Sequence, residues 1–248
     1  EAQKDTILAG NIGISVLDIL EKINPQTWVI LEISTWQMEG IKDRKFRPQT
    51  GVLTNILPDH LDRYHNYKKY IRSEKLIFKH QRPNDNLIVN YDNEETIKIK
   101  KETRLPIYWF SAKEKIEPGC YLENDKLVFQ SGEYKTIFAK ISDLLLPGLH
   151  NLENILAASI VGFIHNIPGE IILKALKNFP GVPYRLELIG EFRGIKFYND
   201  TCATTPEATL AALESFTEQP IILFLGGKDK KLNYENFGEA IGKDKEIK

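Results

Sequence analysis

The sequence has few cysteines and no long apolar run. Among its 248 residues only Cys120 and Cys202 are cysteines, and they form neither a disulfide framework nor a metal-ligand pattern. No apolar run approaches the roughly 18–20 residues of a transmembrane helix. The first residues, from Glu1 to Asp5, carry no apolar signal region. These absences argue against a disulfide-stapled secreted domain and a membrane protein, and we expect a cytoplasmic location.

The sequence also lacks an excess of charge of either sign. It has 33 Lys and Arg against 34 Asp and Glu, which gives a net charge of −1. This balance offers no electrostatic reason to bind nucleic acid or an anionic membrane. The 42% apolar and 27% charged residues are typical of an ordinary globular protein. We expect no nucleic-acid or membrane partner on this basis, and we also expect a monomer whose substrates are small molecules.

A third absence concerns phosphate binding. No Gly-x-x-x-x-Gly-Lys-[Ser/Thr] loop occurs anywhere in the 248 residues, and the chain starts at Glu1 without an initiator Met. We expect the chain to be an incomplete piece. By itself it cannot build that type of ATP site, so we expect it to be inactive alone.

Apolar runs and helical patterns alternate in the first 110 residues. Helical spacing predicts helices near residues 14–20, 67–80 and 94–101. The apolar runs predict strands at Thr6–Ala9, Thr27–Leu31, Gly51–Thr54, Leu87–Asn90 and Ile107–Phe110. This alternation favours a parallel sheet with helices on its faces, and the continuous apolar run Thr27–Leu31 is typical of a strand covered on both faces.

The pattern changes after Pro118. Tyr121–Phe129 predicts a hairpin that turns at Asn124-Asp125, and a further strand is expected at Thr136–Ala139. Two helices are expected at residues 151–164 and 168–179. The first part is thus predicted to be an α/β domain with a mostly parallel sheet and a small antiparallel portion.

A second unit begins after the linker candidate Pro180–Pro183. We divide the chain into residues 1–182 and 183–248 on this basis. Strands are predicted at Arg185–Ile189, Ile195–Tyr198 and Ile221–Leu225, the last of them buried. A helix is predicted to start at Pro206 with Thr205 as its N-cap, and another to occupy the last residues. We expect the second unit to stop partway through a domain.

Polar clusters follow several of the apolar runs. They are Glu32-Ile33-Ser34, the segment from Thr54-Asn55 to Arg63, His150–Asn154, Asn199-Asp200-Thr201 and Leu225-Gly226-Gly227. In open parallel sheets, ligands bind beyond the carboxyl ends of the strands. The clusters therefore predict one large active site.

Three residues are candidates for a Mg²⁺ site. Glu32 is either a solvated loop acid or a ligand, since Mg²⁺ takes oxygen ligands. His60 is either a simple polar contact or part of the metal site. Lys75, on the next predicted helix, is either a surface lysine or a group that binds phosphate or is modified.

Further candidates lie at helix starts and after the last strand. Asn151 and Asn154 share one side of a helix that follows His150, and are either capping or solvated residues or contacts to a nucleotide. Asp200 and Thr204 precede another helix, where free amides either bind an anion or are capped by Thr205. Lys230 is either a solvated loop residue or an anion contact.

Several of these segments, in this order, resemble the Mur ligases, and within them the branch that adds D-glutamate. They are Gly10-Asn11-Ile12-Gly13, Glu32–Glu39, Asn55–Tyr64, His150-Asn151-x-x-Asn154, Pro183–Glu187, Asn199–Thr204 and Leu225–Lys230. The resemblance covers nearly the whole chain, and the Glu-x-Ser-x-x-Gln-x-Glu segment is its most specific part.

The resemblance implies a function and a domain layout. The chain would be a central ATPase domain without its phosphate loop, followed by part of a Rossmann-like C-terminal domain. The parent would use ATP and Mg²⁺ to join D-glutamate to UDP-N-acetylmuramoyl-L-alanine in peptidoglycan synthesis, through an acyl phosphate.

The resemblance also implies roles for single residues. Glu32, His60 and carbamylated Lys75 would serve Mg²⁺, and Asn11 would contact the muramoyl substrate. Thr204 and Lys230 would face D-glutamate. The contacts to ATP would be Asn151, Asn154, Arg185 and Asp200.

One position departs from the family pattern, because Cys202 stands where many members have Lys. The missing cation would weaken one anion contact in the amino-acid site, so the departure concerns which amino acid is added and not the type of reaction. Two alternatives stay open. One is another amide ligase of the superfamily, such as a folylpolyglutamate synthase, and the other is a non-catalytic paralogue that acts as a binding module.

Overall fold

The structure of the chain is a computed structural model. It describes residues 4–58, 61–64, 66–216, 220–228, 232–243 and 247, with Leu61 and Asp62 described by their backbone alone. Among these residues, no helix has both the length and the apolar character needed to cross a bilayer.

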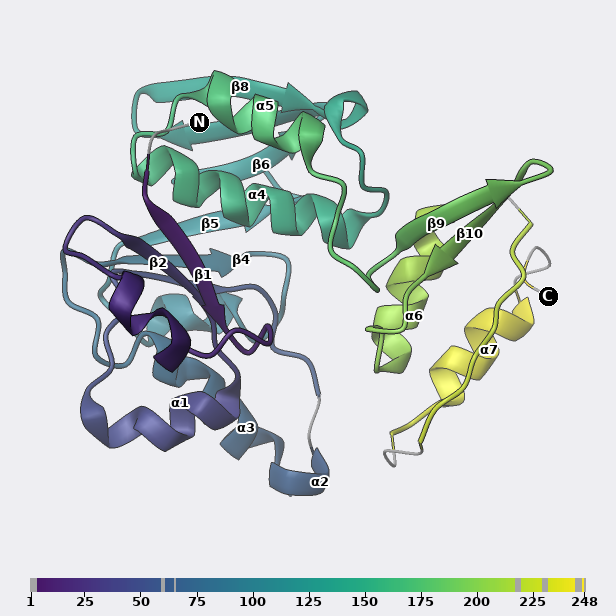
Figure 1. Cartoon of the computed structure of the whole chain (residues 1–248), viewed down its shortest axis with the longest axis horizontal. Helices are drawn as coiled ribbons and strands as arrows, with labels where there is room; N and C mark the ends of the chain where they lie inside the picture. The colour runs from purple at the N-terminus through teal and green to yellow at the C-terminus, as the bar shows by residue number, and fades with distance from the viewer. Residues whose placement is uncertain are drawn as a thin grey trace.

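A six-stranded sheet forms the centre of the larger part (Figure 1). Its strands follow one another in chain order. They are β3 (Thr50–Leu53), β4 (Asn86–Asn90), β5 (Ile107–Ser111), β6 (Gly119–Glu123), β7 (Lys126–Ser131) and β8 (Tyr134–Lys140). Pairing is parallel from β3 to β6 and antiparallel from β6 to β8. The prediction of a mostly parallel sheet with a small antiparallel portion is confirmed.

Side chains of the sheet alternate between two apolar clusters. One cluster packs the sheet against helices α4 (Leu149–Ile164) and α5 (Gly169–Asn178), with Ile88 and Phe110 among its strand residues. The other cluster contains Leu87, Val89 and Trp109, which pack against residues of α3 (Tyr67–Glu74) and of the 3-10 helix η4 (Ile97–Lys101). Because successive strand residues point to opposite faces, helices on both faces require the continuous apolar runs seen in the sequence.

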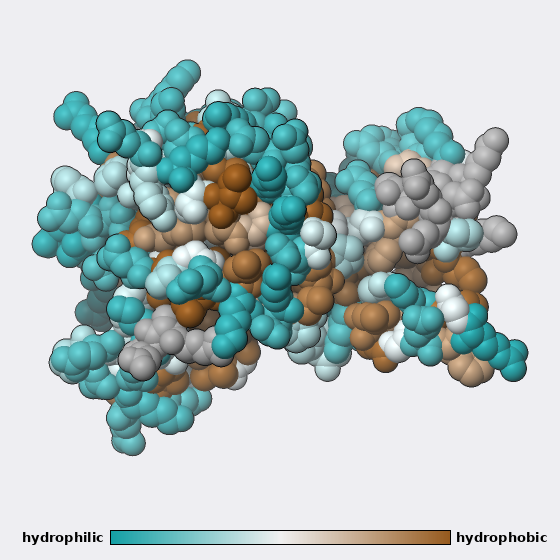
Figure 2. Space-filling view, turned by 90° about the horizontal axis from the view of Figure 1, so that it is seen from above, coloured by the Kyte–Doolittle hydropathy of each residue, from teal (hydrophilic) through white to brown (hydrophobic). Residues whose placement is uncertain are grey.

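The first two strands form a separate parallel pair. β1 (Thr6–Gly10) pairs with β2 (Trp28–Glu32) and with no strand of the six-stranded sheet. The 3-10 helix η1 (Leu17–Lys22) lies between them. The prediction that Thr27–Leu31 is covered on both faces is wrong, because Val29 is exposed and the side chain of Ile30 is 50% exposed. Figure 2 shows apolar residues at the surface of both the larger and the smaller part.

The helices on the α3 side are shorter than expected, and one was not predicted. α3 ends at Glu74 and continues as the 3-10 helix η3 (Lys75–Ile77), while residues 94–101 form only η4. The unpredicted helix is α1 (Thr35–Ile41), followed by η2 (Lys42–Arg44) and, later, by α2 (Leu61–Tyr64). Residues 141–143 form the 3-10 helix η5 (Ile141–Asp143) after β8.

The smaller part consists of a hairpin and helices. β9 (Glu187–Phe192) and β10 (Ile195–Asn199) are antiparallel and joined at Arg193-Gly194, as predicted. The helices are α6 (Pro206–Leu213), η6 (Glu214–Phe216) and α7 (Glu235–Lys243).

The buried strand predicted at Ile221–Leu225 is wrong. Ile221 makes only an isolated bridge to Ile247, and Phe224 is 90% exposed. An apolar run becomes a buried strand only where other elements cover it, and no described residue covers Phe224.

An ion pair between an exposed arginine and a buried aspartate joins the segment before β3 to the turn before β4. Arg47 donates through Nε and Nη2 to the two carboxylate oxygens of Asp85, at 2.6 and 2.7 Å, and the Arg82 amide donates to the same carboxylate at 2.6 Å. The Asp85 side chain is only 2% exposed. The hydrogen bonds from Arg47 lower the pKa of Asp85, against the opposing effect of burial.

We expect Arg47→Met to lower the urea midpoint of unfolding, because it leaves the Asp85 carboxylate buried without its partner. Since the pKa of Asp85 is lowered by folding, the pair stabilises the protein above the ordinary aspartate pKa. This stability is lost as the pH falls through the lowered pKa. In the variant this acid-dependent loss should become smaller, because the hydrogen bonds from Arg47 that lower the Asp85 pKa are gone while burial, which raises that pKa, remains. Urea midpoints measured across the acidic range test this, with Arg104→Met as control because Arg104 is exposed. Superimposable pH profiles would contradict it.

Candidate active site

Asn11 and Glu32 meet at the carboxyl ends of β1 and β2. Gly10 is in register with Glu32, and the Asn11 amide donates to the Glu32 carbonyl at 2.8 Å. Gly10 has φ +112°, and a Cβ there would lie 2.1 Å from the Glu32 carbonyl oxygen, so only glycine allows this approach. Both side chains are exposed, and Asn11 lines a cavity of about 490 Å³ with Gln37. The structure thus brings a predicted metal residue and a predicted substrate residue to one edge.

A capping box fixes the chain immediately after Glu32. The Ser34 hydroxyl accepts from the Gln37 amide at 3.3 Å, and the Gln37 side chain accepts from the Ser34 amide at 3.0 Å. Two otherwise unpaired donors at the start of α1 are satisfied in this way. The same Ser34 and Gln37 belong to the most specific part of the sequence resemblance, so part of that motif has a structural role.

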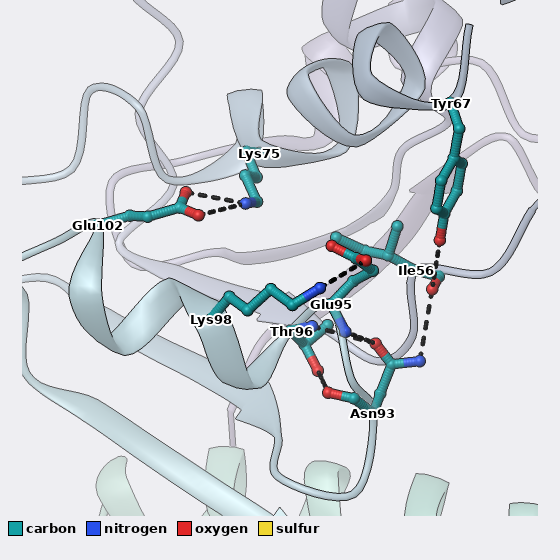
Figure 3. Close-up of polar contacts among 8 residues, drawn as sticks. All are labelled: Ile56, Tyr67, Lys75, Asn93, Glu95, Thr96, Lys98 and Glu102. Atoms are coloured by element: carbon teal, nitrogen blue, oxygen red, sulfur yellow. Dashed lines mark hydrogen bonds and ion pairs between the residues drawn. The ribbon is translucent and has the colours of Figure 1, made fainter.

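His60 lies outside the described residues, but both flanks of its segment are anchored. On one side, the buried Ile56 accepts hydrogen bonds at its carbonyl from Tyr67 Oη (3.3 Å) and Asn93 Nδ2 (3.4 Å), as Figure 3 shows. On the other side, the Arg63 guanidinium lies 4.3 Å from the centre of the Trp36 ring and pairs with Glu39 at 3.4 Å.

Glu39 connects two of the candidate segments. Besides Arg63, it accepts a hydrogen bond from the Ser73 hydroxyl on α3 at 2.5 Å. Glu39 is on α1, which starts just after Glu32, and Ser73 lies two residues before Lys75. One carboxylate therefore holds the helix that follows Glu32 against the helix that precedes Lys75.

Lys75 forms an ion pair with Glu102. Its Nζ lies 2.6 and 2.8 Å from the two carboxylate oxygens, and the lysine side chain is 16% exposed (Figure 3). Both residues line a cavity of about 510 Å³ that also has the cationic side chains of Arg72, Lys79 and Arg104. In this arrangement Lys75 is a paired cation, which is not a ligand for Mg²⁺.

Glu74, the residue before Lys75, is a carboxylate that was not among the predicted site residues. Glu74 is half-buried, and it continues the stripe formed by Tyr67, Tyr70 and Ile71 on the covered side of α3. The helical spacing of these residues could have indicated that Glu74 belongs to the covered side of the helix.

Oxygen donors are present near the strand ends, but those that the structure describes do not gather into a metal cluster. Glu32 offers an exposed carboxylate, which suits Mg²⁺ with water completing its shell. No group of three or more His, Cys, Asp or Glu that could hold a metal occurs among the residues that the structure describes. Glu32 fits the ion, while Lys75 fits it only after leaving Glu102 and losing its positive charge.

Two of the predicted polar clusters are joined at the carboxyl ends of β3 and β4 by Asn90, which was not among the predicted site residues. Asn90 ends β4 and donates to Asn55 and to Glu153 of α4. Burial raises the pKa of Glu153, and the nearby Asp92 raises it further. Asn90 is the polar residue that directly follows the apolar run of β4, and this position could have indicated it as a site residue.

The candidate nucleotide contacts lie at the start of α4. Asn151 donates from Nδ2 to the Pro147 carbonyl at 2.7 Å, and Asn154 is exposed. Because α4 starts at Leu149 with Gly148 as N-cap, neither asparagine caps it. The amide of Asn154 is therefore open to a ligand, and that of Asn151 is partly used.

Asp200 lies near this helix although it belongs to the smaller part. It accepts from the Leu186 amide at 3.0 Å. Burial lowers the pKa of His150, and this effect is opposed first by Asp200, then by a hydrogen bond with the backbone of Ala211 and by Glu214. The end of β10 and the start of α4 thus face one another. Arg185, the fourth candidate nucleotide contact, is exposed.

The candidate amino-acid site is described only in part. Thr204 is exposed and precedes Thr205, whose Oγ1 accepts from the Ala208 amide at 3.3 Å and caps α6 as predicted. The half-buried Cys202 donates its amide to the Tyr184 carbonyl at 3.0 Å. Lys230 lies outside the described residues.

Comparison with known proteins decides the family. A family model described as the Mur ligase middle domain matches residues 10–162. The chain belongs to the Mur ligase family. It is 39% identical over 231 residues to the UDP-N-acetylmuramoylalanine-D-glutamate ligase of Koribacter versatilis, which covers 93% of the chain and 50% of that protein. It is 40% identical over 234 residues to the protein of the same name from Acetivibrio thermocellus, covering 94% of the chain and 49% of that protein.

Solved structures of Mur ligases share the fold. MurF from Acinetobacter baumannii has a TM-score of 0.69 at 19% identity, and covers 89% of this chain and 50% of its own. MurF from Thermotoga maritima, solved in complex with ADP, has a TM-score of 0.64 at 15% identity, and covers 88% of this chain and 52% of its own. This Mur ligase chain therefore spans about half the length of the relatives that it matches.

We expect Asp200→Asn to lower the pKa of His150 further, because removing the carboxylate removes the largest of the effects that favour the charged imidazole. NMR titration of the histidine ring protons in this chain measures the shift. His165 is an internal control, since burial and Lys4 lower its pKa without a contribution from Asp200. An unchanged His150 titration would show that Asp200 and α4 are not neighbours in solution.

Proposed function

We propose that the protein containing this chain joins D-glutamate to UDP-N-acetylmuramoyl-L-alanine, at the expense of ATP, in peptidoglycan synthesis. The observation that carries the proposal is the identity of 39–40% to ligases with that name over more than nine-tenths of the chain. We place this activity in the cytoplasm, with the protein acting as a monomer. We assign residues 1–182 to the central ATPase domain and residues 183–248 to part of the C-terminal domain.

The reaction we propose has two steps. A carboxylate oxygen of UDP-N-acetylmuramoyl-L-alanine attacks the γ-phosphorus of ATP, which gives an acyl phosphate and ADP. The amine of D-glutamate then attacks the acyl carbon, and the tetrahedral intermediate loses a proton and expels phosphate to leave the amide. Mg²⁺, when bound, neutralises charge on the transferred phosphoryl group.

Metal and substrate contacts are assigned by position at the strand ends. Glu32, His60 and Lys75 are proposed to serve Mg²⁺, and Asn11, beside Glu32, to contact the muramoyl substrate. Support comes from the hydrogen bond between the backbones of Asn11 and Glu32 and from the cavity that Asn11 lines.

Nucleotide and amino-acid contacts are assigned to the two helix starts. Thr204 and Lys230 are proposed to hold D-glutamate, whose two carboxylates suit helix amides and an ammonium. The proposed contacts to ATP are Asn151, Asn154, Arg185 and Asp200. The effect of Asp200 on His150 supports a nucleotide site between α4 and β10.

The activity is tested with a full-length protein that contains this chain. We expect release of ADP and phosphate only when ATP, Mg²⁺, UDP-N-acetylmuramoyl-L-alanine and D-glutamate are all present, together with formation of the amide product seen by mass spectrometry. Glu32→Gln should reduce turnover by about tenfold or more, because an ionised ligand becomes neutral. Turnover with a folate and L-glutamate instead would favour the folylpolyglutamate alternative. Binding of ATP without turnover of any acceptor would favour a binding module.

A second test concerns the anionic group that α3 supplies. If Lys75 is carbamylated, Lys75→Ala should reduce turnover by about tenfold or more, because an anionic Mg²⁺ contact is lost. Added short carboxylates should restore part of the rate. Lys79→Ala is the matched control, since Lys79 is an exposed cation of the same cavity.

Glu74→Ala decides between the two neighbouring residues. Normal turnover in Lys75→Ala, with the loss and the carboxylate rescue found in Glu74→Ala, would assign the anionic role to Glu74. That result would agree with the pairing of Lys75 with Glu102.

A further inference from the structure

The side chain of Asn90 has one possible orientation. Asn90 is the last residue of β4 and is 1% exposed. Its Oδ1 accepts from the Asp92 backbone amide at 2.8 Å, and a backbone N–H can only donate, so the oxygen must lie on that side. Nδ2 then points to the other side, where its two hydrogens meet Asn55 Oδ1 at 3.1 Å and Glu153 Oε2 at 3.4 Å.

This orientation determines what Asn55 presents to its surroundings. Its Oδ1 is taken by Asn90, so its Nδ2 lies on the side away from Asn90. Asn55 is exposed, and its Nδ2 makes no hydrogen bond with any residue that the structure describes. The neighbouring Ile56 is buried and held at its carbonyl by Tyr67 and Asn93, which anchors the backbone (Figure 3). Within the part of the chain that the structure describes, an oriented amide donor therefore remains available at the sheet edge.

The position of this donor suggests its acceptor. Asn55 follows β3 at the carboxyl edge of the parallel strands, where ligands of such sheets bind. Through Asn90 it is linked to Glu153, which lies on α4 between the proposed nucleotide contacts Asn151 and Asn154. A group that only donates suits an oxygen that only accepts, and the phosphoryl oxygens of a nucleotide are of this kind.

We propose that Asn55 donates its side-chain amide to a phosphoryl oxygen of the bound nucleotide, and that Asn90 is a positioning residue that sets the direction of this donor. The inference rests on the proposed function, because it needs a nucleotide at this edge. Glu153 is a second positioning residue, since it binds the other hydrogen of Asn90 Nδ2.

The test uses a full-length protein that contains this chain and a non-hydrolysable ATP analogue as probe. Asn55→Asp keeps an oxygen for Asn90 but replaces the free donor by an anion. We expect it to weaken analogue binding by about tenfold or more, and Asn55→Ala by about fivefold. Binding of adenosine, which has no phosphate, should change by less than about twofold. Asn84→Asp adds the same charge in the exposed loop before β4, at the opposite edge, and should leave both affinities unchanged.

A second variant tests the positioning role of Asn90. In Asn90→Asp the buried carboxylate can only accept, so Asn55 must turn its amide inward and its oxygen outward. Analogue binding should then weaken as in Asn55→Asp. In the Asn55→Ala background the same change should have little further effect, which a purely structural role does not predict. Circular dichroism establishes whether each variant is folded, and Asn55→Asp carries the test if Asn90→Asp does not fold.

The outcomes separate this inference from the proposed function. Unchanged analogue binding in both Asn55 variants, or an equal loss for the analogue and adenosine, would overturn the inference. A protein that binds the analogue through Asn55 but does not ligate D-glutamate would overturn the proposed reaction and leave the inference standing. Wild-type protein that binds no analogue would overturn both.

Discussion

The burial of β4 and β5 on both faces is the constraint on which the rest of the structure depends. Leu87, Ile88 and Val89 are fully buried between α4 and the α3 side, so no polar side chain can be placed along the strand without a large desolvation cost. Polar groups are therefore confined to the strand ends. Asn90, the first such group on β4, is still buried, and it is tolerated because its amide and carbonyl groups all have partners.

The same constraint explains why the carboxyl edge is organised and not merely polar. Asn90 ends β4, and its side chain donates to Asn55, which follows β3. Asp92, two residues after β4, accepts from the hydroxyl of Ser111, which ends β5, and from the Ala112 amide. On the α3 side, Glu39 ties α1 to α3 and to the segment that contains Arg63. The loops that leave this edge are thus held by side chains from distant parts of the sequence.

Much of the fold could be predicted because it depends on local patterns. The strands of the main sheet follow from apolar runs, and the hairpins at Asn124-Asp125 and Arg193-Gly194 follow from turn residues. Helix α1 was missed although its capping box, Ser34 with Gln37, is visible in the sequence. Ile221–Leu225 failed for a different reason: an apolar run records a tendency to be buried, while burial itself depends on neighbours elsewhere in the chain.

The candidate site could be predicted only in outline. Asn11 and Glu32 meet because two parallel strands end together, which the pattern anticipates. Lys75 pairs with Glu102, 27 positions away, and Asn90 pairs with Asn55, 35 positions away. Rules based on the spacing of residues along a helix or strand cannot predict contacts over such separations. The direction of a side chain decides whether it can bind a ligand. Because this direction depends on contacts with distant residues, it is the feature of the site that is hardest to predict from the sequence.

Gly148 shows how little space separates the two parts of the chain. It has φ +95° at the start of α4, and a Cβ in its place would lie 2.2 Å from the Ser215 hydroxyl, which follows α6. At this position α4 and the smaller part are therefore in close contact, and only the absence of a side chain at Gly148 leaves room for Ser215. Any larger side chain would be strained by this backbone conformation and would meet Ser215 Oγ and the His150 ring, so at least one of these two side chains would have to shift. A substitution at Gly148 would therefore disturb the contact between α4 and the segment after α6 through His150 and Ser215, although Gly148 itself has no side chain to offer a ligand.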